Sequence, residues 1–179
     1  MQQKVIDLKV RKYLFKAEAG CNASQYYFYK LSKGNKEFEI IGVNFLQKLL
    51  LQMPPHEVKK IIDSIDGTRL TKADFEYEYT YMLILVAAYA LDCGNFATGV
   101  YWAKKSLDMV DYFHPFIDKA TRGKILEGEN YVWAKEIFEE YNDYFDYEIF
   151  NGNGVPFPWE ENRYSNLFSG NDNQKNLTL

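Results

Sequence analysis

The chain has 179 residues, of which 47% are hydrophobic and 17% aromatic, and its net charge is −4. This length supplies one well-packed core and is too short for two ordinary domains. The sequence contains no run of about 18 apolar residues, which argues against a membrane span. Residues 1–7 lack the apolar core of a secretion signal. We therefore expect a single-domain cytoplasmic protein without a membrane partner.

The charges are unevenly distributed along the chain. Residues 1–36 contain eight Lys and Arg against two acids, a net of +6, whereas residues 37–179 contain thirteen against twenty-three, a net of −10. This pattern fits either a basic arm for an acidic partner or, as we prefer, two ends of one elongated domain that differ in charge. The only candidate patch for nucleic acid consists of Lys9, Arg11, Lys12 and Lys16. The acidic total argues against nucleic acid, because phosphate affinity depends on positive charge.

Two helices are predicted in the first third of the chain. Ile6, Val10 and Ala17 share one helical face, and Gly20 is a usual helix stop. Apolar and charged residues also alternate here as they would in a strand, but we prefer the helix. The second helix carries Tyr27, Phe28 and Leu31, with Asn22 or Ser24 as its N-cap.

Residues 37–66 combine an ambiguous start with two clear helices. Residues 37–43 fit a helix or a strand, because apolar residues alternate with acids and Gly42 weakens a helix. From Asn44 the helical pattern is clear and ends at Pro54-Pro55. Proline suits the first turn of a helix. The following helix presents one apolar face and ends at Gly67; that face consists of Val58, Ile61, Ile62 and Ile65.

Residues 71–110 are predicted to form a central pair of helices that fold back at residues 92–95. The first helix has two apolar stripes, and a helix apolar on two sides is normally sandwiched between neighbours. One stripe consists of Phe75, Tyr79, Met82, Val86, Tyr89 and Cys93, and the other of Tyr77, Tyr81, Ile84 and Ala88. Thr71 and Asp74 resemble a capping box. We expect Gly94 to be a packing residue, and we expect the only two cysteines, Cys21 and Cys93, to be buried.

The rest of the chain divides into two helices and an irregular segment. A helix is predicted from Pro115 to Leu126 and another over residues 131–148. The last helix should turn Ala134, Ile137, Phe138, Tyr141 and Phe145 inward and a stripe of acids that includes Glu136, Glu139 and Glu140 outward. Residues 1–150 therefore form one helical domain, whereas residues 151–179 are polar and rich in Gly and Asn, with no packed element predicted.

The predicted turns recur at intervals of about 34, 40 and 34 residues, a period typical of stacked helical hairpins. Three turns resemble those of the tetratricopeptide superfamily and its Sel-like variant. Residues 16–27 look like the Sel-like turn, and two further sets match tetratricopeptide positions: Gly94, Phe96, Gly99, Ser106 and Leu107, and then Tyr131, Ala134 and Phe138. The likeness extends over residues 5–148 but departs from the pattern at Pro54-Pro55.

This resemblance implies a curved stack whose concave face is lined by the first helix of each hairpin. Tyr81 and Asp92 from the third hairpin and Lys119 and Glu127 from the fourth would point into that face. Tyr81 fits a core position equally well, and the charged residues also fit a solvated surface. Phe157 and Trp159 lie in the irregular segment, and we hypothesise that this segment occupies the groove in cis.

Residues with catalytic or metal-binding potential are few. His56 and His114 are the only histidines, each adjoins a proline at a helix boundary, and no spacing of His and Cys suits a metal. The carboxylates are explained by solvated helix faces. Gly152 and Gly154 lack the helix or lysine that a phosphate loop needs. We expect neither a catalytic site, nor a metal, nor a cofactor.

The sequence therefore predicts an all-α, right-handed stack of about four helical hairpins, or eight helices. We expect a non-enzymatic adaptor that captures a peptide or protein in its concave groove, with aromatic rings supplying contact area. One alternative is a small inhibitor, such as an immunity protein or a phage counter-defence protein. Another is an enzyme or small-molecule binder with a pocket that the sequence does not reveal.

Overall fold

The computed structural model describes residues 2–144, with side chains from Leu8 onward, and this range is helical without strands. Its elements are α1 (Gln2–Glu18), α2 (Asn22–Ser32), α3 (Glu39–Gln52), α4 (Pro55–Asp66), α5 (Lys72–Asp92), α6 (Phe96–Phe113), α7 (Lys119–Leu126), α8 (Glu129–Tyr141) and the 3-10 helix η1 (Asn142–Tyr144). The all-α class and the eight predicted α-helices are confirmed. Residue 1 and residues 145–179, which include the predicted irregular segment, lie outside the described range.

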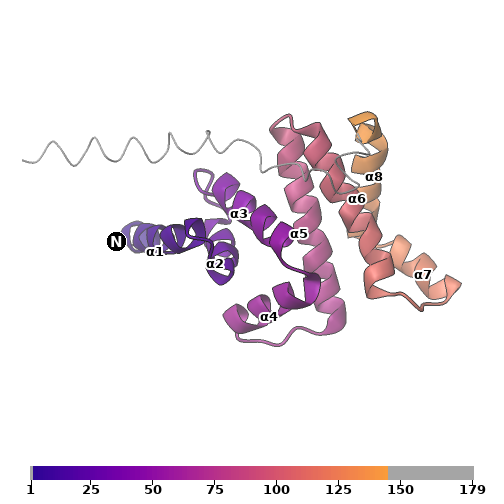
Figure 1. Ribbon diagram of the computed structural model, residues 1–179, viewed down its shortest axis with the longest axis horizontal. Helices are drawn as coiled ribbons and strands as arrows, with labels where there is room; N and C mark the ends of the chain where they lie inside the picture. The colour runs from indigo at the N-terminus through magenta and orange to yellow at the C-terminus, as the bar shows by residue number, and fades with distance from the viewer. Residues whose placement is uncertain (1, 145–179) are drawn as a thin grey trace, which may run out of the picture.

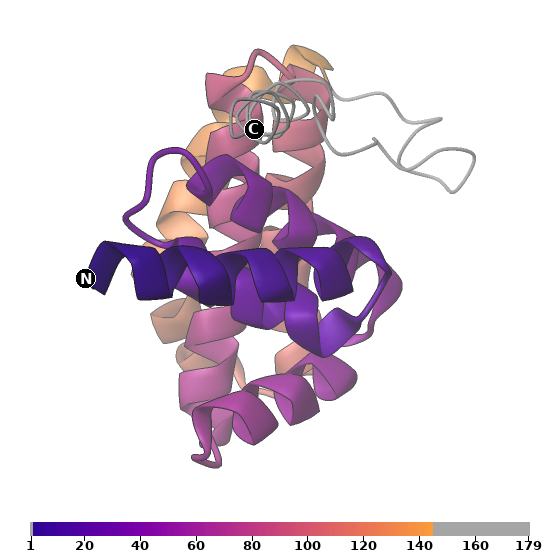
Figure 2. The same cartoon turned by 90° about the vertical axis from the view of Figure 1, so that its left-hand side faces the viewer.

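The helices form an elongated stack that runs from α1 at one end to α8 at the other (Figure 1). Along this stack α1 packs on α2, α2 on α3, α3 on α5, α5 on α6, and α6 on α8. Helices α5 and α6 run upright, whereas α1 lies across them (Figure 2). The chain therefore builds its core mainly from contacts between helices that are close in sequence.

Two of the four predicted hairpins are closely packed pairs, namely α1 with α2 and α5 with α6. The other two pairs touch only slightly. Helix α4 has more contact with α2 than with α3, and α8 packs on both α6 and α5. Helix α7 has only eight residues, and none of them is buried. Because α7 lacks an apolar face, α8 takes the place beside α5.

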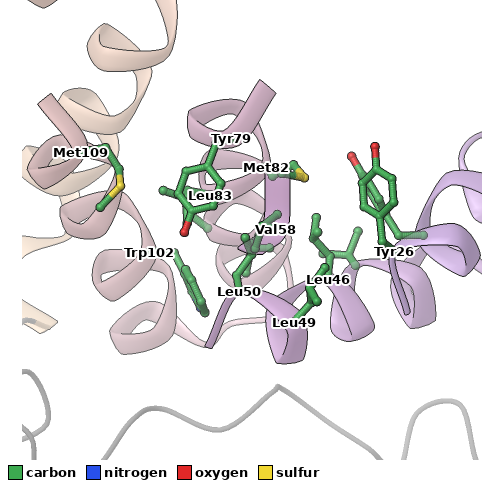
Figure 3. Close-up of a cluster of buried hydrophobic side chains, with 14 of the residues drawn as sticks. Tyr26, Leu46, Leu49, Leu50, Val58, Tyr79, Met82, Leu83, Trp102 and Met109 are labelled. Carbon is green, nitrogen blue, oxygen red and sulfur yellow. The ribbon is translucent and has the colours of Figure 1, made fainter. Parts of the chain in front are cut away.

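The core is organised around α5, as the sequence predicts. One of its stripes is buried over Phe75, Tyr79, Met82 and Val86. Side chains of α3, α5 and α6 meet there, with Leu50, Leu83 and Trp102 among them (Figure 3). A second, smaller cluster joins α1, α2 and α3 through Val10, Leu14, Ala17, Phe28, Ile41 and Phe45.

The sequence left residues 37–43 open between helix and strand, and the structure has residues 37 and 38 in a turn and residues 39–43 in α3, with Gly42 inside the helix. A Cβ atom at this position would lie 1.9 Å from Ser32 Oγ and 3.2 Å from Tyr29 Cα. Glycine lowers helix propensity, but here it allows α3 to approach α2 closely. The tertiary contact therefore outweighs the local preference.

The turn between α5 and α6 corrects the prediction for Gly94. Its φ is +80°, and no atom lies within 4 Å of a Cβ built at this position. Gly94 is therefore required for its left-handed backbone, which lets Asn95 N donate to Ala90 O at 2.8 Å. The packing residue is Gly99, where a Cβ would lie 2.6 Å from Leu91 Cδ2.

The helix caps and the two cysteines agree with the sequence-based predictions only in part. Thr71 Oγ1 accepts a hydrogen bond from Asp74 N at 3.1 Å, so the predicted capping hydroxyl is confirmed. The same hydroxyl donates to Asp74 Oδ2 at 2.7 Å. The N-cap of α2 is Cys21 and not Asn22 or Ser24. Cys21 is exposed, contrary to the prediction, because it lies in the turn between α1 and α2 and not on a buried helix face. The Ser24 hydroxyl donates to Cys21 Sγ at 3.2 Å. Cys93 is half-buried against the main core.

We expect Gly42→Ala to lower the free energy of unfolding by about 1–3 kcal/mol, because the added methyl group overpacks the contact of α2 with α3. Gly123→Ala is the matched control, since no atom lies within 4 Å of its Cβ position in α7. The control should be neutral or gain up to about 1 kcal/mol. Urea unfolding measures both, and equal effects of the two substitutions would contradict the proposed role of Gly42.

One cation lies largely within the contact between α3 and α6. Lys105 Nζ lies 5.1 Å from the centre of the Trp102 ring and donates to Leu50 O at 3.5 Å. Leu50 O is one of the last four carbonyl groups of α3, which lack intrahelical partners. Burial lowers the pKa of Lys105. The free energy of unfolding is therefore smaller when the Lys105 ammonium group is charged than when it is neutral.

In the unfolded chain Lys105 has its ordinary pKa of about 10.4. At pH values between the lowered pKa of the folded protein and this value, the unfolded chain binds more protons than the folded protein does. Over this range Lys105 therefore makes the free energy of unfolding rise with pH. Lys105→Met should remove that rise. The wild type should therefore gain stability relative to Lys105→Met as the pH increases from about 7 to about 10. Urea unfolding across this range measures the difference. Lys104→Met, next to it, is the control, and parallel pH profiles of all three proteins would contradict the prediction.

Candidate functional site

An open groove lies between α5 and α8, and we call it the α5–α8 groove. Its volume is about 370 Å³. The lining residues are Tyr81, Ile84, Leu85, Ala88, Trp133, Glu136 and Ile137. All of them except Glu136 are apolar or aromatic, so the groove offers a binding surface to apolar groups.

The floor of the groove is the second apolar stripe of α5. Tyr81, Ile84 and Ala88 belong to that stripe, and their spacing places them on one side of the helix. The first stripe is covered by the core, whereas Tyr81 and Ala88 are only half-buried. The prediction that α5 has two apolar sides is confirmed, but its second side is only partly covered.

Helix α8 forms the wall of the groove. Ala134 is fully buried, whereas Trp133 beside it is 39% exposed and lines the groove. The side of α8 that carries Trp133 also carries Glu129, Glu136 and Glu140, because these residues recur at helical spacing. All three glutamates are exposed, as the sequence predicts for Glu136 and Glu140, but Glu136 also lines the groove. The wall is therefore aromatic and acidic.

Asn130 fixes the first turn of α8 against α5. Its Nδ2 donates to Tyr77 O and to Thr80 Oγ1, each at 3.0 Å. The Asn130 side chain is buried, and its Oδ1 atom has no hydrogen-bond partner. The predicted turn at residues 127–130 gave no sign of this role, because the contact joins residues about fifty positions apart.

A second, more polar hollow of about 230 Å³ lies where α5 and α6 meet the turn between α7 and α8. Glu76, Thr80, Ser106 and Asn130 are among its lining residues. The Ser106 hydroxyl is buried without a hydrogen-bond partner, so no base activates it. His114 Nε2 instead lies 2.6 Å from the Glu76 carboxylate. This pair links the end of α6 to the first turns of α5.

The described residues contain no group of three or more His, Cys, Asp or Glu side chains that could hold a metal ion. His56 is exposed, and its Nε2 lies 3.3 Å from Glu57 Oε1 in the same helix. Each of the two described histidines therefore lies beside a single glutamate.

The structure places the predicted site residues in three different settings. Tyr81 lines the groove. Asp92 is exposed at the end of α5, one turn beyond Ala88, on the same side of the helix as Tyr81. Lys119 and Glu127 are exposed at the two ends of α7 and do not line the groove, because α8 forms its wall. Phe157 and Trp159, with the hypothesis that they occupy the groove, lie outside the described residues.

Of the seven lining residues, only Tyr81 was predicted from the sequence to bind a partner. Leu85 and Trp133 were given no role, whereas the other four were assigned to an apolar stripe, the core or a solvated face, namely Ile84, Ala88, Ile137 and Glu136. Trp133 and Glu136 are three positions apart and so share a side of α8. That spacing was visible in the sequence. What it did not show was that this side faces α5 and not the solvent alone.

Comparisons with protein-family models, with curated proteins and with solved structures find no match to this chain. Within residues 2–144, no helix combines the length and the apolar character needed to cross a membrane.

Replacing Asn130 should loosen α8 from α5. We expect Asn130→Ala to lower the free energy of unfolding by about 1–3 kcal/mol, because two hydrogen bonds are lost. Asn130→Asp should cost more, since a carboxylate oxygen would replace the donor that faces Tyr77 O. Thermal and urea unfolding measure both variants. Asn142→Asp, at an exposed position after α8, is the control, and an equal effect there would contradict the docking role.

Proposed function

We propose that this protein is a non-enzymatic binding module that captures a peptide or a protein segment in the α5–α8 groove. The observation that carries this proposal is an apolar groove with a partly exposed tryptophan in its wall. Tryptophan and tyrosine are the side chains that most often dominate binding energy at protein interfaces. Tyr81 lies on the floor of this groove and Trp133 in its wall.

The charges around the groove favour a partner with basic residues. Glu136 lines the groove, Glu129 and Glu140 lie on the same side of α8, and Asp92 lies at the end of α5. Complementary charges steer a partner into its orientation and reject partners of the same sign. The occupant should therefore combine large apolar side chains with lysine or arginine.

The resemblance to tetratricopeptide repeats supports the same proposal. Proteins built from stacked helical hairpins use their extended curved faces for binding. On this basis we propose that the protein acts as a tetratricopeptide-like adaptor in the cytoplasm. Its groove is formed by α5 and α8 because α7 is too short and too polar to contribute a wall.

A selection from a phage-displayed library of random peptides tests the groove directly. Enriched peptides should contain basic residues and large apolar residues together. Trp133→Ser should weaken their binding by about tenfold or more, as loss of an interface tryptophan does. Isothermal titration with synthetic copies of the enriched peptides measures the change.

Phe116→Ser is the matched control, because Phe116 is 98% exposed and lies outside the groove. It should leave peptide affinity unchanged. Failure to enrich any peptide, or equal binding to the wild type and to Trp133→Ser, would contradict the proposal. Circular dichroism of each variant verifies that the fold is intact.

A further inference from the structure

The outer face of α1 is apolar and basic. Leu8 is 69% exposed and Phe15 is 75% exposed. The two residues are seven positions apart, a spacing of about two helical turns that places both side chains on one side of the helix. The opposite side packs on α2 through Val10, Leu14 and Ala17. The exposed face therefore has no partner among the described helices, although it carries two large hydrophobic side chains.

Four cations accompany these two side chains. Lys12 lies between Leu8 and Phe15 on the same face, whereas Lys9, Lys16 and Arg11 border it. All four are exposed, and Glu18 is the only exposed acid among the described side chains of α1. Because solvated apolar side chains carry a free-energy cost, this pattern suits a surface that is both apolar and acidic.

The α5–α8 groove is such a surface. Its floor extends from Tyr81 to Ala88, and its wall presents Trp133 and Glu136. Seven positions separate Tyr81 from Ala88, as seven separate Leu8 from Phe15, and each span corresponds to about 10 Å along a helix. The two surfaces therefore agree in length, in apolar character and in opposite charge.

The two surfaces lie at different ends of the stack, with α1 at one end and α8 at the other (Figure 1). A groove and a helix face at opposite ends cannot meet within one chain. Contact between unlike surfaces of identical chains generates rings when the rotation closes and open head-to-tail arrays when it does not, and it does not generate two-fold dimers.

From these observations we infer that the occupant of the α5–α8 groove is the outer face of α1 from a second copy of this chain. Leu8 and Phe15 enter the groove, and the lysines and arginine of α1 face the glutamates of α8. This inference rests on the proposed function, because it names the partner for the same groove. Exposed charge pairs are screened by salt, so the association weakens as ionic strength rises.

Sedimentation velocity of the full chain over a range of concentrations tests this contact. The wild type should form a series of species that grow with concentration. Phe15→Glu disables the α1 face and Glu136→Lys disables the groove, so either variant should weaken self-association by about tenfold or more, as loss of an interface anchor does. Phe116→Glu and Glu139→Lys are the matched controls, since Glu139 lies on another side of α8.

A mixture of the two disabled variants gives the sharpest result. The Phe15→Glu protein keeps its groove and the Glu136→Lys protein keeps its α1 face, so together they can form one contact and no more. The mixture should sediment as a heterodimer that does not grow further. Two variants that remain monomeric when mixed, or controls that weaken association as much as the variants do, would overturn the inference.

The remaining outcomes separate the inference from the proposed function. If the wild type stays monomeric while Trp133→Ser loses library peptides, the groove binds another protein and the second-copy inference fails alone. If the wild type stays monomeric and binds vesicles containing phosphatidylserine through Phe15, the α1 face serves a membrane and the inference is also overturned. If the wild type self-associates but no groove variant affects association or peptide binding, both proposals fail.

Discussion

The packing of α5 against helices on two of its sides is the contact on which the rest of the structure depends. Phe75, Tyr79 and Met82 bury one side in the core, and Asn130 holds α8 beside another. The remaining apolar side, which includes Tyr81 and Ala88, stays partly open. The groove is therefore a direct consequence of a helix that has more apolar surface than its neighbours cover.

The two ends of the stack carry opposite charges. The basic first part of the chain forms α1 and α2 at one end of the stack, and the acidic α8 lies at the other (Figure 1). Because the two ends carry opposite charges, the basic end of one molecule attracts the acidic end of another. Attraction between unlike ends and apolar contact within the groove act together, because charge orients an encounter and buried apolar area retains it.

Local sequence patterns predicted the helices well, but they predicted less well which helices pack against one another. Spacing and residue type were enough to predict the two stripes of α5, the N-cap at Thr71 and the turn at Gly94. The sequence did not show that α8, and not α7, packs beside α5, because periodicity identifies an apolar face but not the helix that covers it. Gly42 and Asn130 show the same limit, since each acts through a contact that is distant in the sequence.

Photo-crosslinking from the groove shows directly whether α1 of a second copy occupies it. A p-benzoylphenylalanine residue at position 133 places a photoreactive ring in the groove wall, and the same residue at position 116 is the control. On irradiation we expect a covalent dimer in which position 133 of one copy is joined to residues 8–16 of another, identified by mass spectrometry. A chain that stays monomeric, a crosslink to another region, or equal dimer formation from position 116 would contradict this expectation.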